Sequence, residues 1–338
     1  MYPKENISLK TYNTFGINAV AEKFISIQTT EQLKSLIQEK LPANFLIIGG
    51  GSNILFSNPS VPYVIHIDSK GISKIYEDEN KVHLKVMAGE NWHQLVLYCI
   101  ENNYGGIENL SLIPGNVGTA PIQNIGAYGV EIKDVFVSCE TLSVHTGETQ
   151  VFTLEECEFD YRTSVFKTRE KGNYIITSVT LCLTKKNHLL KTEYGDIKNY
   201  LQQLGVMGTP TIRQISEVVI AIRNSKLPDP KVLGNSGSFF KNPVVEKTVF
   251  DRFISKFPEA PFYVVAENQF KIPAGWLIEQ SGFKGKRFGD AGVHEKQALV
   301  LVNYGSASGD ELLSLAKKIQ VTVLEKFGIA IEPEVNII

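Results

Sequence analysis

FLIIGGGSN, residues 45–53, sets an apolar run directly before three glycines, a serine and an asparagine. The preceding segment, 29–41, predicts an amphipathic helix that opens with a capping box and stops at Pro42. Residues 63–67 after the glycines predict a strand, so the chain opens in a β-α-β-like way. Glycines after a strand let backbone N–H groups approach a phosphate closely. The stretch therefore predicts a phosphate-binding turn, with an ordinary glycine turn as the alternative.

A second glycine-rich stretch, IPGNVGTAPIQNIGAYG (113–129), carries no charged residue. Its glycines and prolines disfavour both a helix and a regular strand, so we expect extended backbone lying against a large, flat ligand. Two such stretches in one mostly β region suggest a dinucleotide wrapped by loops. The alternative is a long structureless connection, which compact domains seldom contain unless it is functional.

The rest of the chain predicts an α+β fold. Between about residues 68 and 186 the pattern is mostly strands, interrupted by one helix at 92–102. Helical patterns follow up to Leu204 and at 211–223, where Thr211 and Gln214 form another capping box. The two prolines of KLPDPK then indicate a domain junction. The C-terminal region predicts mixed helices and strands, with Pro333 placing the final strand at an edge or a bulge.

Three short motifs could carry chemistry. FDYRTSVFK places Arg162 between aromatic and hydroxyl residues, which suits a bidentate grip on a carboxylate or phosphate, unless it is a solvated strand arginine. EPEVN puts Glu332 and Glu334 on one strand face, where solvated edge acids are the alternative. In GNSGSFFKNP we expect Ser238 to be the hydroxyl that neighbouring residues enclose most tightly. No GxSxG elbow surrounds Ser238, so proton donation suits it better than a nucleophilic triad.

Composition narrows the class of protein. The chain has 338 residues, 43% hydrophobic and 21% charged, with a net charge of −2, which is typical of a globular protein and gives no electrostatic reason to bind nucleic acid or anionic lipid. The start lacks the apolar run of a signal peptide, and no window is apolar enough for a membrane span. The four cysteines form no CxxC pair, so we expect buried reduced thiols and no metal site. These features predict a cytoplasmic protein.

Taken together and in order, the motifs closely resemble the family of UDP-N-acetylenolpyruvoylglucosamine reductases (UDP-N-acetylmuramate dehydrogenases). The resemblance covers nearly the whole chain. It rests on NTFG (13–16), GGGSN, IPGNVGTAPIQNIGAYG, the Tyr161-Arg162 pair, KLPDPK, GSFFKNP, AGWLI, VHEKQALVLVN and EPEV. EYGDI (193–197) resembles the extra tyrosine-bearing loop of one form of this family.

The resemblance implies an FAD-containing enzyme of peptidoglycan precursor synthesis. It implies a two-part FAD-binding domain of the vanillyl-alcohol-oxidase type at 1–67 and 68–227, with the tyrosine loop near 188–200. A substrate-binding domain at 228–328 and a C-terminal strand at 329–338 would follow. NADPH would reduce the flavin, which passes hydride to C3 of the enolpyruvyl group on UDP-N-acetylglucosamine, and protonation at C2 would give UDP-N-acetylmuramate.

The resemblance also implies roles for single residues. Ser238 would donate the proton to C2, while Arg162 and Glu334 would polarise the substrate carboxylate. The residues implied to bind FAD are Gly49, Gly50, Gly51, Ser52, Asn53, Thr119, Ile122, Gly126 and Arg223. Those implied to bind substrate are Tyr128, Tyr194, Lys226, Asn242 and Gln297, with Tyr194 closing over it. No metal and no obligate protein partner is implied.

Two other classes of function remain open on the sequence. One is a different flavin enzyme on the same fold, such as an alcohol oxidase that uses oxygen. The other is a non-catalytic flavin-binding module, for which replacing Ser238 by alanine would change nothing measurable.

Overall fold

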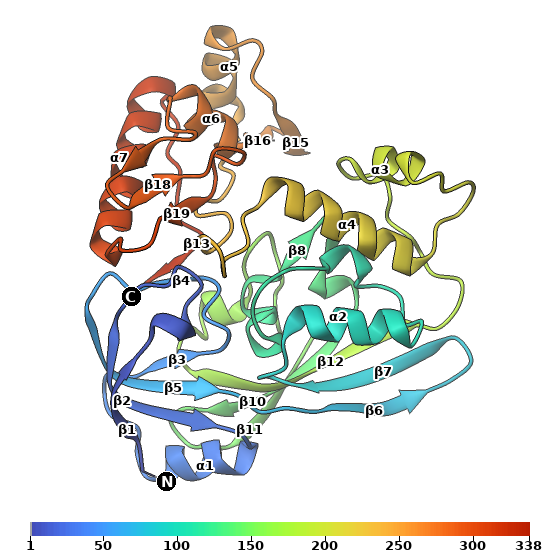
Figure 1. Ribbon diagram of the computed structural model, residues 1–338. Helices are drawn as coiled ribbons and strands as arrows, with labels where there is room; N and C mark the ends of the chain where they lie inside the picture. Colours follow the sequence, from blue (N-terminus) through green and yellow to red (C-terminus); the bar gives the residue numbers. More distant parts are fainter. Residues whose placement is uncertain (1) are drawn as a thin grey trace. The chain divides into compact units, whose positions relative to one another are not determined.

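A computed structural model describes residues 2–338, which form two compact units (Figure 1). Unit 1 comprises residues 2–7, 21–50 and 61–225, and unit 2 comprises residues 8–20, 51–60 and 226–338. Helices and strands occur in both, as the α+β expectation requires. The finer division into two FAD-binding subdomains, a substrate-binding domain and a terminal strand stays a prediction.

Two larger sheets and four helices build most of unit 1. The first sheet has the order β1-β2-β5-β3, with β3 parallel to β5, and the second has the order β11-β10-β12-β7-β6. The strands are β1 (Lys4–Ser8), β2 (Val20–Ile27), β3 (Leu46–Ile48), β5 (Ser60–Ile67), β6 (Ile72–Glu77), β7 (Lys81–Met87), β8 (Gly126–Ala127), β9 (Val130–Glu131), β10 (Phe136–Ser143), β11 (Thr149–Thr153) and β12 (Tyr174–Thr184). The helices are α1 (Thr30–Gln38), α2 (Trp92–Glu101), α3 (Ile197–Gln203) and α4 (Ile212–Lys226).

Local sequence explains these elements. In β7 the buried residues alternate with less buried ones, which confirms the expected period of two. Thr29 caps α1 by accepting a hydrogen bond from the Gln32 amide, although α1 ends at Gln38, before Pro42. The Thr211–Gln214 capping box of α4 is confirmed in both directions, at 2.9 and 3.2 Å.

The core of unit 1 lies on its sheets. One face of α2, including Trp92, Leu95 and Val96, packs on the buried residues of β7, β10 and β12. A second cluster joins α1 to β2 and β5. A third joins α3 to α4, with Tyr128 and Leu190 packed against it. These clusters leave the glycine-rich segment 113–129 bounded by packed elements rather than by solvent alone.

Unit 2 is built around a sheet of order β13-β19-β18-β17, with α7 packed on β18 and β19. A smaller sheet, β14-β16-β15, lies with α5, and β20 pairs in parallel with β4. The strands are β4 (Ile54–Leu55), β13 (Gly234–Asn235), β14 (Val244–Glu246), β15 (Tyr263–Ala266), β16 (Gln269–Lys271), β17 (Arg287–Phe288), β18 (Ala291–Val293), β19 (Leu301–Asn303) and β20 (Asn336–Ile337). The helices are α5 (Lys247–Lys256), α6 (Ala274–Gln280) and α7 (Gly309–Phe327).

Two expectations about local structure were wrong. Segment 113–129 is not extended, because it folds into the short 3-10 helices Val117–Thr119 and Pro121–Gln123 followed by β8. The C-terminal segment is not one strand, since only Asn336–Ile337 pairs regularly and Pro333 makes an isolated bridge with Phe240. In both places proline removes a backbone donor and interrupts regular pairing.

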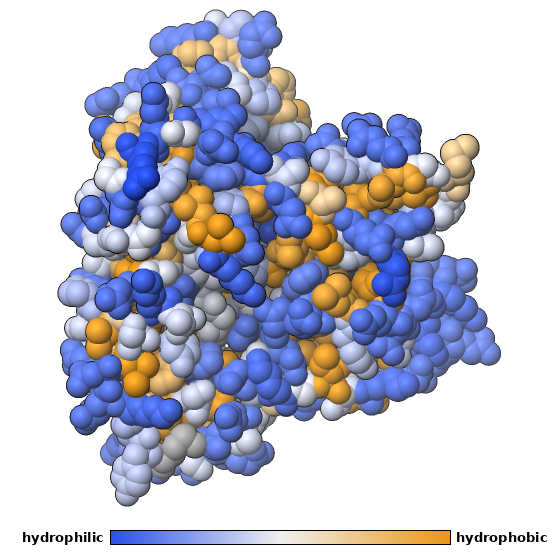
Figure 2. Space-filling view, viewed as in Figure 1, coloured by the Kyte–Doolittle hydropathy of each residue, from blue (hydrophilic) through white to orange (hydrophobic). Residues whose placement is uncertain are grey.

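The cysteines of residues 2–338 match the expectation of buried reduced thiols except at Cys182, which is half-buried. All four cysteines are free thiols, and Cys99, Cys139 and Cys157 are buried. A hydrogen bond with Cys157 and burial raise the pKa of Cys139, so the Cys139 thiol stays protonated. The described chain has no cluster of side chains that could hold a metal ion, and no helix in it is long and apolar enough to cross a membrane. On the face shown in Figure 2, hydrophobic residues reach the surface only in separate patches.

Candidate active site

The two glycine-rich stretches lie against each other in unit 1. A Cβ built on Gly50 would lie 2.9 Å from Asn116 Oδ1 and 3.0 Å from Gly115 Cα, and one on Gly49 would lie 3.0 Å from Thr119 Cγ2. A side chain at Gly50 would therefore crowd the Gly115 backbone and the Asn116 side chain, and one at Gly49 would crowd the Thr119 methyl group. The structure thus brings Gly49 and Gly50 to the second glycine-rich stretch.

The end of the first glycine loop belongs to unit 2. Gly51 has φ +59°, and a Cβ there would lie 1.9 Å from the Tyr12 carbonyl oxygen, so only glycine fits. Ser52 is half-buried. Asn53 Nδ2 donates to the backbone oxygen of Glu334 at 3.3 Å. The loop thus runs from one unit to the other, and its last residue contacts a predicted catalytic residue.

Arg162 lies in a turn of unit 1 and not in a strand, so the solvated strand arginine is ruled out. It is half-buried, with φ +54°, a left-handed conformation that costs a non-glycine residue free energy. Its Nη2 donates to the Gly126 carbonyl at 2.7 Å, and Ser164 Oγ donates to the Ile122 carbonyl at 2.7 Å. Three predicted site residues, Ile122, Gly126 and Arg162, are therefore held together.

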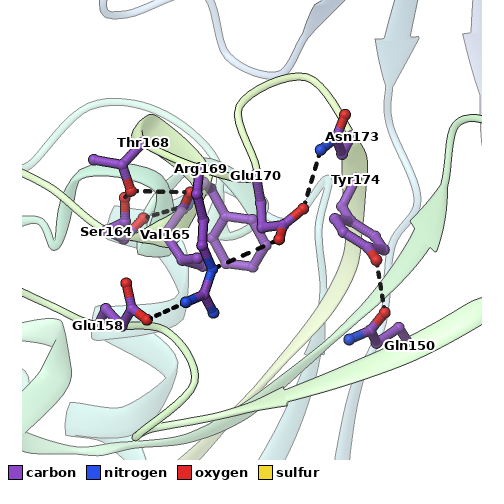
Figure 3. A network of polar contacts seen from close by, with 10 residues as sticks. Gln150, Glu158, Ser164, Val165, Thr168, Arg169, Glu170, Asn173 and Tyr174 are labelled. Atoms are coloured by element: carbon purple, nitrogen blue, oxygen red, sulfur yellow. Dashed lines mark hydrogen bonds and ion pairs between the residues drawn. The ribbon is translucent and has the colours of Figure 1, made fainter.

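A network of polar contacts follows this turn (Figure 3). Arg169 contacts Glu158 at 2.5 Å and Glu170 at 3.6 Å, and Asn173 donates to Glu170 at 3.0 Å. The Thr168 hydroxyl donates to the Ser164 backbone oxygen at 3.1 Å. Because Ser164 Oγ also contacts the Ile122 carbonyl, the Thr168 hydrogen bond links this stretch to the turn, whereas the exposed ion pairs of Arg169 contribute little.

Arg223 adds a second half-buried cation to unit 1. Its Nε is shielded from solvent and finds no hydrogen-bond partner within residues 2–338. Burial lowers the pKa of Arg223, with Tyr128 opposing this and Arg162 adding to it, although an arginine stays charged at neutral pH. Burial and then Arg223 lower the pKa of His93. Positive charge without a partner at Nε fits an anionic ligand.

These observations test whether unit 1 suits FAD. The cradle at Gly49 and Gly50 has no space for a side chain, and Arg223 carries an unpartnered buried N–H. Both features suit the phosphates and polar edge of a flavin nucleotide. The residues present therefore fit the cofactor.

In unit 2 the loop that carries Ser238 is rigidly anchored. Gly237 has φ +69°, and its amide donates to Asn235 Oδ1 at 2.9 Å. Phe239 and Phe240 are 0% and 1% exposed, and the Phe239 amide donates to the Leu299 carbonyl at 2.7 Å. The two phenylalanines thus hold the backbone beside Ser238 in the core.

The structure brings the chain segments that carry Ser238 and Glu334 together in unit 2. The Glu334 amide donates to the carbonyl of Phe239, the residue after Ser238, at 2.8 Å, and Phe240 bridges Pro333. Glu332 is exposed and Glu334 half-buried. One expectation was wrong, because Ser236 is the more enclosed hydroxyl: it is buried, Ser238 is half-buried, and Ser236 Oγ has no partner within residues 2–338.

Two predicted substrate residues of unit 2 meet at the start of α6. Asn242 Oδ1 accepts a hydrogen bond from the Ala274 amide at 2.9 Å. A Cβ on the next residue, Gly275, would lie 3.2 Å from Gln297 Oε1. Asn242 and Gln297 are both half-buried, so their side chains remain within reach of a ligand. Lys226, the exposed last residue of α4, also belongs to unit 2.

The other two predicted substrate residues meet in unit 1. The rings of Tyr128 and Tyr194 lie edge to face with centroids 6.4 Å apart. Tyr194 is 55% exposed, and Tyr128 is half-buried with φ +50°. The tyrosine-bearing segment is therefore already in contact with the end of the glycine-rich stretch.

Sequence reasoning missed the asparagines that hold these loops. Asn13 donates to the carbonyls of Leu9 and Ile17 at 2.8 and 3.0 Å, which shapes the NTFG turn. Asn235 holds Gly237, as described above. Asparagines beside glycine and serine are a known turn signal, and that signal could have found both.

Two known protein domains match separate parts of the chain. Residues 21–153 match the FAD binding domain, and residues 229–338 match the C-terminal domain of UDP-N-acetylenolpyruvoylglucosamine reductase. The Asn235–Phe240 loop lies in the second match, and the glycine-rich stretches lie in the first.

Relatives of the same length are similar along the whole chain. A UDP-N-acetylenolpyruvoylglucosamine reductase of Flavobacterium johnsoniae is 57% identical, covering 99% of each chain. One of Pseudomonas putida is 46% identical, covering 99% of this chain and 98% of its own.

Solved structures show the same architecture. The UDP-N-acetylenolpyruvylglucosamine reductase (MurB) of Thermus caldophilus aligns with a TM-score of 0.68 and 25% identity, covering 99% of both chains. The 4-ethylphenol oxidase of Gulosibacter chungangensis aligns with a TM-score of 0.50 and 11% identity, covering 97% of this chain and 84% of its own, which indicates a shared fold alone. The chain therefore belongs to the family of UDP-N-acetylenolpyruvoylglucosamine reductases, FAD-binding oxidoreductases.

Proposed function

We propose that the protein catalyses the NADPH-dependent reduction of UDP-N-acetylglucosamine enolpyruvate to UDP-N-acetylmuramate in peptidoglycan precursor synthesis. The observation that carries the proposal is the hydrogen bond of 2.8 Å from the Glu334 amide to the Phe239 carbonyl. It joins the segments of the proposed proton donor and the proposed catalytic acid, which are distant in sequence. A non-catalytic flavin-binding module has no need of that pairing.

FAD, when bound, supplies the hydride that the reaction adds at C3 of the enolpyruvyl group. Gly49, Gly50 and Thr119 would hold its diphosphate in unit 1, and Ile122 and Gly126 would contribute backbone contacts. Arg223 would meet a negatively charged edge of the cofactor, because its Nε lacks a protein partner within residues 2–338. Gly51, Ser52 and Asn53 continue the same loop.

Arg162 would neutralise the substrate carboxylate. Hydride cannot add to an unactivated enol ether, so electron density must move onto the carboxylate, and a fixed cation stabilises that charge. The hydrogen bond to Gly126 and the left-handed backbone keep the guanidinium from relaxing elsewhere. Preorganisation of this kind removes the cost of reorienting the group during the reaction.

Ser238 would give its hydroxyl proton to C2. An alcohol is a weak acid, so the proton acceptor must be strongly basic and water must be excluded. The buried Phe239 and Phe240 exclude water on one side of the Ser238 backbone. Glu334 would help to polarise the carboxylate through a proton or a water, because a bare anion would repel it.

The side chains predicted to bind substrate would hold the UDP moiety. Lys226 supplies positive charge for the diphosphate. Asn242 uses its oxygen on the Ala274 amide, which orients its amide nitrogen as the donor for a ligand. Gln297 lies beside the same turn. Tyr128 would contact the substrate, and Tyr194 would cover it.

The test is to follow NADPH absorbance under low oxygen with purified holoenzyme, with and without UDP-N-acetylglucosamine enolpyruvate. Sustained loss of NADPH that requires the enolpyruvyl sugar is the expected result. A yellow protein that ignores this sugar would overturn the proposal. NADH in place of NADPH measures the strictness of the nucleotide preference in the same assay.

The second candidate is a flavin oxidase that uses oxygen. The only support for it is the fold that the chain shares with the 4-ethylphenol oxidase. Such an enzyme would need no grouping of Ser238 with Glu334.

Because both proposed substrates are nucleotides, the proposal also places the enzyme in the cytoplasm, with no nucleic acid or membrane as partner.

A further inference from the structure

The tyrosine loop, residues 187–196, is fixed at its base and exposed at its tip. At the base, His188 Nδ1 and Thr184 Oγ1 share a hydrogen bond of 2.7 Å, and Leu190 packs against two core clusters. At the tip, Glu193, Tyr194 and Gly195 are exposed. The position of Tyr194 therefore depends on the contacts that hold the middle part of the loop, between its base and its tip.

A single buried side chain links that middle part to the glycine-rich stretch. Asn109 is 0% exposed, and its Nδ2 donates to the Lys191 carbonyl at 2.8 Å and to the Tyr128 carbonyl at 3.0 Å. Because both neighbours are carbonyl oxygens, the amide nitrogen must face them. Both hydrogens of one NH₂ group thus hold two chain segments that are not adjacent in sequence.

The position of Asn109 is itself well determined. It lies in the 3-10 helix Glu108–Leu110. Trp92 Nε1 donates to the Leu110 carbonyl at 3.0 Å, and the Glu108 carboxylate accepts from the Gly106 amide at 2.7 Å. Ser111 Oγ, next in the chain, shares a hydrogen bond of 2.8 Å with Ser216 Oγ on α4. A fixed platform therefore presents the amide group.

The two segments that Asn109 holds carry the two tyrosines. Tyr128 and Tyr194 lie edge to face, and a Cβ on Gly129 would lie 3.4 Å from Tyr194 Cβ, so the loop approaches the glycine-rich backbone closely. Moving the Lys191 or the Tyr128 carbonyl would change the separation of the rings. Asn109 controls both carbonyls.

We infer that Asn109 is a positioning residue that latches the tyrosine loop to the glycine-rich stretch and so sets Tyr194 over Tyr128 for substrate binding. The effect on substrate rests on the proposed function, whereas the latch itself does not. Asn109 Oδ1 is buried and has no partner within residues 2–338, so the two Nδ2 bonds are all that the side chain contributes.

The structure supplies a direct readout of the latch. Lys191 is exposed, and its carbonyl is the scissile carbonyl of a trypsin site at Lys191–Thr192. Cleavage requires that this segment open locally, and the opening equilibrium sets the rate when closing is fast. Asn109→Asp keeps the shape but loses both donors and sets a carboxylate against two carbonyls. In the FAD-loaded enzyme it should speed cleavage after Lys191 by roughly tenfold or more.

Asn103→Asp is the matched control. Asn103 Nδ2 donates to the Lys185 carbonyl at 3.0 Å, an equivalent amide-to-carbonyl bond with the same sequence separation, but at an exposed site before the loop. It should leave cleavage after Lys191 unchanged. Equal cleavage rates in Asn109→Asp and the unmodified enzyme would overturn the latch. If Asn109→Asp fails to retain FAD, Asn109→Ala is measured instead, since it loses both donors without adding charge.

Kinetics separate a positioning role from general loss of structure. Asn109→Asp should raise the KM for the enolpyruvyl sugar about tenfold while reduction of the bound flavin by NADPH alone stays unchanged. In a Tyr194→Ala background the same change should have no further effect on KM, because Asn109 acts through Tyr194. An equal effect in both backgrounds would overturn the proposed route. Faster cleavage in an enzyme that ignores the sugar would retain the latch and refute the proposed function instead.

Discussion

Two loops carry two of the proposed catalytic side chains, Arg162 and Ser238, and they are held in different ways. The Arg162 turn in unit 1 keeps a non-glycine residue at φ +54° with side-chain hydrogen bonds to the carbonyls of Ile122 and Gly126. The Ser238 loop in unit 2 puts a glycine at φ +69° and anchors it with two phenylalanines that are at most 1% exposed. The Arg162 turn depends on polar side-chain contacts, whereas the Ser238 loop depends mainly on the packing of buried side chains.

The difference teaches what each loop can tolerate. A left-handed non-glycine residue costs about 1–2 kcal/mol, which is offset in the first loop by hydrogen bonds worth about 1 kcal/mol each. Its structure should therefore respond to changes in charge and donors. The second loop has no such strain, so it should respond to changes in backbone freedom and packing.

The largest expected effect comes from Ser238→Ala. Loss of a positioned proton donor should lower turnover about a thousandfold. FAD binding and the urea midpoint should stay unchanged, because Ser238 is only half-buried and the phenylalanine anchor remains. Ser236→Ala is the matched control in the same loop, and it should retain turnover, since its hydroxyl has no partner to lose within residues 2–338. Similar turnover in both variants would remove Ser238 from the proposed chemistry.

Arg162→Lys should lower turnover about a hundredfold, because an ammonium keeps the charge but not the planar fork of donors. The variant should also lose about 1 kcal/mol of unfolding free energy with the Gly126 hydrogen bond. Arg169→Lys, in the exposed ion pair with Glu158, should change both quantities little. Steady-state kinetics and urea unfolding measure the two effects, and an active Arg162→Lys enzyme would contradict the assignment.

Gly237→Ala should lower the unfolding free energy by about 1–2 kcal/mol through the backbone alone. An added Cβ would meet nothing within 4 Å, so packing contributes little. Gly172→Ala tests the same conformational cost in unit 1, at φ +82° with equally open space, and should leave turnover intact. If Gly237→Ala is as active as Gly172→Ala, the glycine does not set the position of Ser238.

The smallest expected effect is a pH dependence of the unfolding free energy that comes from His93 in unit 1. His93 Nδ1 accepts from the amide of Leu112, another left-handed residue at φ +59°, and burial with Arg223 lowers the pKa of His93 below 6.5. Between that folded pKa and 6.5 the unfolded chain binds more protons, so stability rises with pH there and is lost as pH falls. His93→Asn, which can retain the acceptor, should flatten the dependence in urea unfolding from pH 7 to about 5. An unchanged slope would exclude His93 as its source.

The sequence predicted those features of the molecule that depend on residues close together in the chain, such as helix caps and strand alternation. The N-cap at Thr29, the capping box at Thr211 and the alternation in β7 follow from neighbours within one element, although Gln32 accepts from the Gln28 amide and so does not complete a box at Thr29. The family, the fold class and FAD followed from motifs in a fixed order.

What escaped prediction depends on contacts between distant segments. Nothing local to Asn109 indicates that it meets Lys191, and nothing local to Arg162 indicates a left-handed turn held by Gly126. The 3-10 helices in 113–129 escaped for the same reason, since a glycine-rich composition permits many backbones and tertiary contacts select one.

The discontinuity of unit 2 has a consequence for how the protein is made. Its first segment, 8–20, bonds to residues synthesised much later: the Asn235 amide donates to the Thr14 carbonyl at 3.0 Å and Asn303 Nδ2 to the Phe15 carbonyl at 2.9 Å. On the ribosome these early residues must wait, unpaired, while all of unit 1 emerges. Long-range closure of this kind slows folding and leaves apolar surface exposed meanwhile. The Ser238 loop should therefore be the last part to form, and chaperones should bind nascent chains that lack residues 226–338.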